Sequence, residues 1–69
     1  MNVIELTVEM NRKQNVLQLP EGSTVEQLLD SLGLYPDAHI VVRGKVPIPI
    51  DSPVIENDLL RILKVASGG

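Results

Sequence analysis

The absence of cysteine is the feature that most constrains how this short chain can fold. Its 69 residues are enough for one domain, and a core of that size buries only roughly 60% of the surface of the unfolded chain. Domains of this length are often held together by disulfides or metal ions, but this chain can form no disulfide, thiolate zinc site, iron–sulfur cluster or catalytic thiol. Its stability must come from aliphatic packing, for which it has ten Leu, nine Val and six Ile.

The charge balance and the shortage of aromatic residues argue against several kinds of partner. Nine acidic and six basic residues give a formal net charge of −3. A surface that binds the phosphates of nucleic acids would instead carry clustered Lys and Arg. Tyr35 is the only aromatic residue, so the chain has no platform for stacking bases. No apolar stretch approaches the roughly 20 residues of a membrane span, and the first residues do not resemble a signal peptide. We therefore expect a soluble, monomeric, cytoplasmic protein that contacts neither nucleic acid nor membrane directly.

Strict alternation of apolar and polar residues predicts a strand at residues 3–10. A polar turn at residues 11–14 follows, and residues 15–20 are expected to form the second strand of a hairpin. Pro20 and Gly22 then end that strand. The side of the first strand that should face the core carries Ile4, Leu6, Val8 and Met10.

The segment GSTVEQLLDSLGL at residues 22–34 has the start and stop signals of a helix. Ser23 is the expected N-cap, and Glu26 lies at the spacing of a capping box. Gly33 suits the left-handed position after the last turn, with Leu34 folding back onto the helix. One apolar stripe, as required of a helix that lies on a sheet, is formed by Val25, Leu28, Leu29 and Leu32.

The rest of the chain predicts further strands on one small core. Residues 39–45 form a third strand that ends in a glycine turn, and residues 59–65 form a strong last strand. Between them the three prolines of residues 46–58 allow at most a short edge strand. The order of these elements predicts an α+β domain with one mixed sheet of four to five strands and a single main helix across one face.

The chain resembles the ubiquitin-like β-grasp proteins over essentially its whole length. Within them it is most similar to the small archaeal modifier proteins and to the sulfur carriers of thiamine and molybdopterin synthesis. Two features depart from these relatives: Glu56-Asn57-Asp58 stands where many have Asp-Gly-Asp, and the RGK turn lacks the Asn frequent in bacterial carriers. The resemblance rests on the segments MNV, GSTVEQLLDSLGL with its following Pro, VVRGKVPIPIDSPV, the END turn and, most specifically, LKVASGG.

The resemblance implies a β-grasp domain at residues 1–65 and a flexible tail at residues 66–69 that carries the reactive carboxylate of Gly69. An adenylating enzyme that uses ATP and Mg²⁺ would activate this carboxylate. The products would be a thiocarboxylate, for tRNA thiolation or for molybdopterin or thiamine synthesis, or an isopeptide bond to target lysines. Partners would then be that enzyme, a sulfur donor or acceptor, and modified proteins, with no cofactor bound by the chain itself. The tail residues are small so that they can thread a narrow channel: Ala66, Ser67, Gly68 and Gly69.

A partner-binding patch is expected on the face of the sheet away from the helix. In the last strand Leu60 and Ile62 should point to the core, which turns Leu63 and Val65 outward. In the third strand Ile40 and Val42 are expected to point inward and Val41 outward, so that the predicted patch is Val41, Leu63 and Val65. The resemblance also suggests Lys45, which follows the glycine turn, as an acceptor lysine.

No arrangement of residues predicts a catalytic or metal site within the domain. His39 is the only histidine, and a metal there would need Asp30 or Asp37. A loop with Asp51, Glu56 and Asp58 is more simply a set of solvated turn carboxylates. The chain is therefore expected to be a substrate and carrier, not an enzyme. The alternative is a β-grasp interaction domain whose terminal Gly-Gly is incidental.

Overall fold

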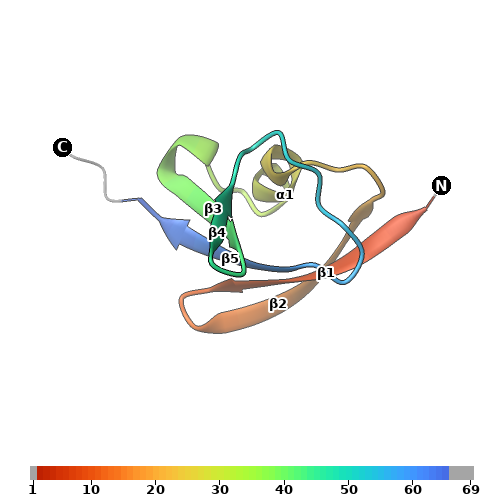
Figure 1. Cartoon of the computed structure of the whole chain (residues 1–69), viewed down its shortest axis with the longest axis horizontal. Helices are drawn as coiled ribbons and strands as arrows, with labels where there is room; N and C mark the ends of the chain where they lie inside the picture. Colours follow the sequence, from red (N-terminus) through yellow and green to blue (C-terminus); the bar gives the residue numbers. More distant parts are fainter. Residues whose placement is uncertain (1, 66–69) are drawn as a thin grey trace.

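The computed structural model describes residues 2–65, in which five strands form one sheet and a helix crosses one of its faces (Figure 1). The order across the sheet is β2-β1-β5-β3-β4. Because β5 pairs with β1 in parallel and with β3 antiparallel, the sheet is mixed, and the predicted α+β architecture is confirmed. Along the chain the elements are β1 (Val3–Met10), β2 (Lys13–Pro20), α1 (Val25–Ser31), the 3₁₀ turn η1 (Pro36–Ala38), β3 (His39–Arg43), β4 (Val46–Ile48) and β5 (Leu59–Lys64).

The β1–β2 hairpin turns over two residues, and β2 therefore begins two residues earlier than the predicted start of the 15–20 strand. Met10 pairs with Lys13 on either side of the turn. Asn11 and Arg12 have φ angles of 53° and 65°, the two left-handed conformations of a type I′ turn. This turn matches the twist of the flanking strands, which explains how a polar segment supports a long hairpin.

We expect Arg12→Gly to stabilise the domain by about 0.5–1 kcal/mol, because the strain of a Cβ in the left-handed region exceeds the entropy that glycine adds to the unfolded chain. Asn11→Gly is the matched control. It should change the stability less, since asparagine already tolerates this conformation. Urea denaturation followed by circular dichroism measures both variants, and a less stable Arg12→Gly protein would contradict the expectation.

Helix α1 is capped by Thr24 and Gln27, one residue later than predicted. The Thr24 hydroxyl accepts a hydrogen bond from the Gln27 N–H at 3.3 Å, and the Gln27 side-chain oxygen accepts from the Thr24 N–H at 2.8 Å. Ser23 is buried and donates to the carbonyl of Pro20 at 2.6 Å, while Glu26 is exposed. The pairs Ser23–Glu26 and Thr24–Gln27 both have the spacing of a capping box. The prediction of Ser23 as the N-cap was wrong, because its hydroxyl donates to Pro20 and closes the loop after β2.

The C-terminal end of α1 is as predicted. Gly33 has a φ of 73°, and its N–H donates to the carbonyl of Asp30 at 3.0 Å. The N–H of Leu34 donates to the carbonyl of Leu29 at 2.9 Å, which completes a Schellman motif. This motif fixes the direction in which the chain leaves the helix.

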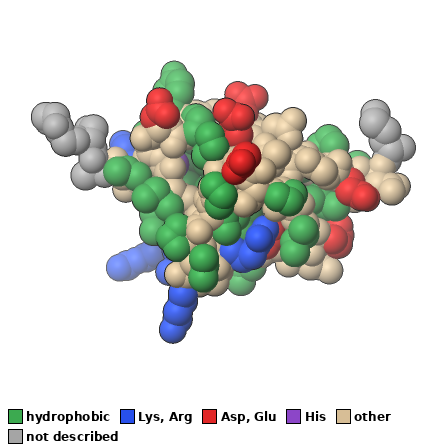
Figure 2. Space-filling model, turned by 45° about the horizontal axis from the view of Figure 1, so that its top comes forward, with side chains coloured by type: hydrophobic (Ala, Val, Ile, Leu, Met, Phe, Trp, Pro, Cys, Tyr) green, Lys and Arg blue, Asp and Glu red, His purple; other side chains and the backbone are tan. Residues whose placement is uncertain are grey.

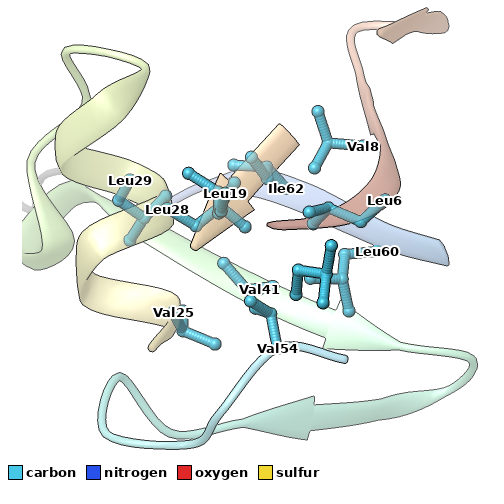
Figure 3. Packing of buried hydrophobic residues seen from close by; sticks show 11 residues of the cluster. Leu6, Val8, Leu19, Val25, Leu28, Leu29, Val41, Val54, Leu60 and Ile62 are labelled. Atoms are coloured by element: carbon cyan, nitrogen blue, oxygen red, sulfur yellow. The ribbon is translucent and has the colours of Figure 1, made fainter. Parts of the chain in front are cut away.

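A single aliphatic core lies between α1 and the inner face of the sheet, with helix side chains pointing toward those of the strands (Figure 3). Full burial of each large aliphatic side chain contributes about 1.5–3 kcal/mol, so that the chain can fold without disulfides. The buried cluster consists of Ile4, Leu6, Val8, Leu19, Val25, Leu28, Leu29, Val41, Val54, Leu60 and Ile62.

Strand β3 presents the opposite faces from those predicted. Val41 lies across from Ile62 and is 2% exposed within the core. Ile40 lies across from Leu63 and is 43% exposed on the other face. Ile40, Val41 and Val42 are consecutive β-branched residues without alternation, so the side that each occupies is decided only by how β3 pairs with β5.

The segment after β3 forms the predicted short edge strand, β4, with Pro47 at the sheet edge opposite Val42. The chain then returns to the start of the helix. The N–H groups of Val25 and Glu26, at the start of α1, donate to carbonyls at positions 52 and 50, each at 2.9 Å. The proline-rich loop therefore satisfies N–H groups that a helix start leaves unpaired.

An ion pair with a buried carboxylate joins β3 to the turn before β5. Arg43 donates from Nε and Nη2 to the two carboxylate oxygens of Asp58 at 3.0 and 2.7 Å. Asp58 also accepts from the N–H of Ile55 at 3.2 Å. The Asp58 side chain is only 4% exposed, against 37% for Arg43. The hydrogen bonds to Asp58 and the charge of its carboxylate raise the pKa of Arg43 above its ordinary value, whereas burial works in the opposite direction.

The END turn, residues 56–58, has Asn57 at its centre. Asn57 has a φ of 63°, a conformation that asparagine tolerates better than most residues. Its N–H donates to the carbonyl of Glu5 at 2.7 Å, and the Glu56 carboxylate accepts from the N–H of Glu5 at 3.1 Å. The turn is thus tied to β1.

Within residues 2–65, neither α1 nor η1 is long and apolar enough to cross a membrane.

Candidate partner-binding site

The face of the sheet away from α1, which we call the outer face, carries apolar side chains on β3 and β5. The register places Ile40 beside Leu63 and Val42 beside Arg61. Ile40 and Leu63 are 43% and 46% exposed, and Val65, which follows on the same side of the chain, is 39% exposed. We define the outer-face patch as Ile40, Val42, Leu63 and Val65.

The patch agrees with the predicted one at Leu63 and Val65 and differs at Val41. Val41 is in the core, and its two neighbours Ile40 and Val42 take its place on the outer face. Arg43, two residues after Val41 and on the same side of β3, reaches the buried carboxylate of Asp58, which agrees with the inward direction of Val41. No sequence signal shows this, since a charged residue at this position would suggest the opposite face.

A hollow of about 170 Å³ adjoins the patch. Val42, Gly44 and Leu59 line it, together with Glu9 and Arg61, whose carboxylate Oε2 and Nε lie 3.8 Å apart. Exposed charges at that distance attract each other weakly, so a partner can displace them. The hollow extends the apolar surface toward the β3–β4 turn.

The outer-face patch lies at the point where the chain leaves the sheet. Val65 is the last residue that the structure describes, and its N–H donates to the carbonyl of Ala38 at 2.8 Å. The predicted tail at residues 66–69, with Gly69, lies outside the described residues. Lys45 is exposed in the turn between β3 and β4, and its role as an acceptor stays a prediction.

The residues considered for a metal site do not come together. His39 Nδ1 lies 2.9 Å from the carbonyl oxygen of Tyr35. Asp58 and Glu56 are engaged with Arg43 and with the backbone of β1, as described above. Within residues 2–65, no group of three metal-ligating side chains is present.

Comparison with known proteins agrees with this arrangement. The chain matches the model of the small archaeal modifier protein 2 family over residues 2–66. It is 37% identical over 62 residues to the sulfur carrier protein TtuB of Thermus thermophilus, with 78% of this chain and 95% of that protein covered.

Two solved structures show the same fold at low sequence identity. The ubiquitin of Caldiarchaeum subterraneum matches with a TM-score of 0.73 and 12% identity, over 99% of this chain and all of that one (100%). A ubiquitin-like domain of an Arabidopsis thaliana protein matches with a TM-score of 0.74 and 15% identity, over 93% and 79% of the two chains. The fold is therefore the ubiquitin-like β-grasp, and the chain belongs to the small archaeal modifier protein 2 family of ubiquitin-like modifiers and sulfur carriers.

Proposed function

We propose that this protein is a modifier and sulfur carrier whose Gly69 carboxylate is activated by an adenylating enzyme. The observation that carries the proposal is its family membership, together with an apolar patch beside the point where the chain leaves the sheet. The similarity to a protein named as a sulfur carrier supports the same role. In this role the chain is a protein substrate and not a catalyst.

The chemistry follows from the weakness of a carboxylate as an electrophile. A Gly69 carboxylate oxygen attacks the α-phosphorus of ATP, pyrophosphate leaves, and an acyl-adenylate forms. A sulfide equivalent then attacks the carbonyl carbon and displaces AMP, which yields the thiocarboxylate. If the attacking group is a lysine amine, AMP is again displaced and an isopeptide bond results. The activating enzyme supplies the Mg²⁺ and the nucleotide site for these steps.

The composition of the last four residues suits delivery into an enclosed site. Four extended residues reach at most about 13–14 Å beyond the domain. Gly68 and Gly69 have no Cβ, so they fit a narrow channel and can adopt backbone angles closed to other residues. The reach is short, and the enzyme must therefore hold the domain close to its nucleotide site.

We expect the outer-face patch to be the surface that the adenylating enzyme holds. Leu63→Asp should weaken binding about tenfold or more, because an aliphatic side chain buried at an interface contributes roughly 1.5–3 kcal/mol. Val16→Asp is the matched control: Val16 is 63% exposed on β2, two strands away from β5. Isothermal titration with the enzyme measures both. Equal losses for the two variants would show that the patch is not the docking surface.

Incubation of the full chain with its adenylating enzyme, ATP and Mg²⁺ tests the proposed function. We expect exchange of labelled pyrophosphate into ATP and, with a sulfide source, a mass increase equal to the replacement of one oxygen by sulfur. Mass spectrometry of the C-terminal peptide of protein purified from its source shows whether Gly69 is the natural end. An intact Gly69 terminus without pyrophosphate exchange would favour an interaction domain whose final glycines are incidental.

A further inference from the structure

The side of α1 that faces away from the core borders a second hollow, of about 490 Å³. Glu26 and Asp30 line it from the helix, and Leu34, Tyr35 and Pro36 line it from the segment that follows. Its size falls in the range of small-ligand pockets. It lies on the helix side of the sheet, so a partner could occupy it while another holds the outer face.

Tyr35 provides an aromatic wall whose backbone is held in place. It is the only aromatic residue of the chain and is 77% exposed. Its carbonyl oxygen accepts from the N–H of Ala38 at 3.0 Å and lies 2.9 Å from His39 Nδ1, and the ring of Pro36 limits the following φ. The Schellman motif fixes the chain just before it. The backbone that carries the ring therefore needs no further ordering when a ligand stacks on it.

The two carboxylates of the hollow have no counter-charge. Within residues 2–65, Glu26 and Asp30 make neither an ion pair nor a side-chain hydrogen bond, and the last helical turn contains no basic residue. Like charges four residues apart repel, and an acid near a helix C-terminus opposes the helix dipole. Asp30 therefore slightly destabilises its own helix, and a bound cation would relieve this effect.

In Figure 2 acidic side chains lie near the top and at the right of the face shown, whereas basic side chains project at the lower left and lie near the middle. We propose that the hollow beside Tyr35 binds an arginine side chain of a positively charged segment of a partner protein. A guanidinium can stack on the tyrosine ring while it donates to the Glu26 and Asp30 carboxylates. The apolar surfaces of Leu34 and Pro36 cover the stem of the same side chain.

A titration of the full-length ¹⁵N-labelled chain with a capped peptide of alternating Arg and Gly tests this proposal. Amide shifts should concentrate at residues 26–36, and a peptide with Gln in place of Arg should produce none. Tyr35→Leu keeps an apolar wall but removes the aromatic face, and it should weaken binding about threefold. Shifts that appear on dilution or concentration of the chain without peptide would indicate a second copy as the occupant and would overturn the proposal.

A pair of charge-matched variants separates a site from general attraction. The double variant Glu26→Gln/Asp30→Asn should weaken peptide binding about fivefold or more. Glu5→Gln/Glu21→Gln removes the same charge from exposed residues on β1 and just after β2, and it should weaken binding less than twofold. Thermal unfolding verifies that both variants fold, and the first should change the unfolding temperature little, because the relief of charge repulsion is offset by the loss of a favourable acid in the first helical turn. Equal losses of affinity would overturn the proposal.

Discussion

Deleting Gly68 and Gly69 is expected to abolish both pyrophosphate exchange and thiocarboxylate formation, with no measurable change in thermal stability. The deletion leaves a carboxylate on Ser67, but that group ends about 7 Å short of the original position. It also replaces a glycine by a residue with a Cβ at the reacting end. Stability should persist because the buried apolar cluster begins at Ile4 and ends at Ile62.

Gly69→Ala is the finer test of the same expectation. It keeps the length and the carboxylate and adds one methyl group, which disfavours positive φ and widens the chain next to the reacting carbon. The second-order rate constant of pyrophosphate exchange should fall strongly, while the unfolding temperature stays that of the original chain. Full activity of the deletion variant would show that these glycines are not the reactive end, and the proposed carrier role would fail with them.

Arg43→Met is expected to remove about 3 kcal/mol of the free energy of unfolding, which is a large part of what a domain of this length possesses. The variant leaves the carboxylate of Asp58, with 4% of its side chain exposed, with only the N–H of Ile55 as a partner. The estimate is at the lower end for buried pairs because Arg43 is 37% exposed. Urea denaturation at neutral pH measures the loss.

Asp58→Ala is the informative companion to Arg43→Met. The guanidinium that it leaves is partly exposed and can turn toward water, so we expect a smaller loss than for Arg43→Met. Removing both partners should cost less than the sum of the two single changes, since no buried charge then remains unpaired. A larger loss for Asp58→Ala would mean that the carboxylate acts mainly by holding the turn before β5.

Local signals account for the parts of the fold that could be predicted. The alternation of residues 3–10 and the Gly33-Leu34 stop signal each depend on neighbours a few residues away, and both are confirmed. The cap was misplaced because Ser23 and Thr24 offer the same local chemistry. What separates them is the loop contact between Ser23 and Pro20, which the spacing of the motif does not reveal.

The candidate site was only partly predictable, for a related reason. Leu63 alternates with core residues of its own strand, and its outward direction could be derived from β5 alone. Val41 lies among β-branched neighbours, and its direction depends on pairing with a strand about twenty residues away. The hollow beside Tyr35 lies within residues 26–36, but the spacing of the helix stop signal does not reveal that the chain after Gly33 brings Tyr35 beside the helix acids.

The central place of β5 has a consequence for how the protein is made. β5 is the common neighbour of β1 and β3 (Figure 1), so a chain interrupted before residue 59 would contain α1 and two hairpins, without the strand that joins the hairpins into one sheet. Isolated hairpins are marginally stable in water, and the pairing of β1 with β5 can form only late, since it joins distant parts of the sequence. Prematurely terminated products would stay open to proteolysis. The ribosome must therefore have synthesised β5 before the complete sheet can form.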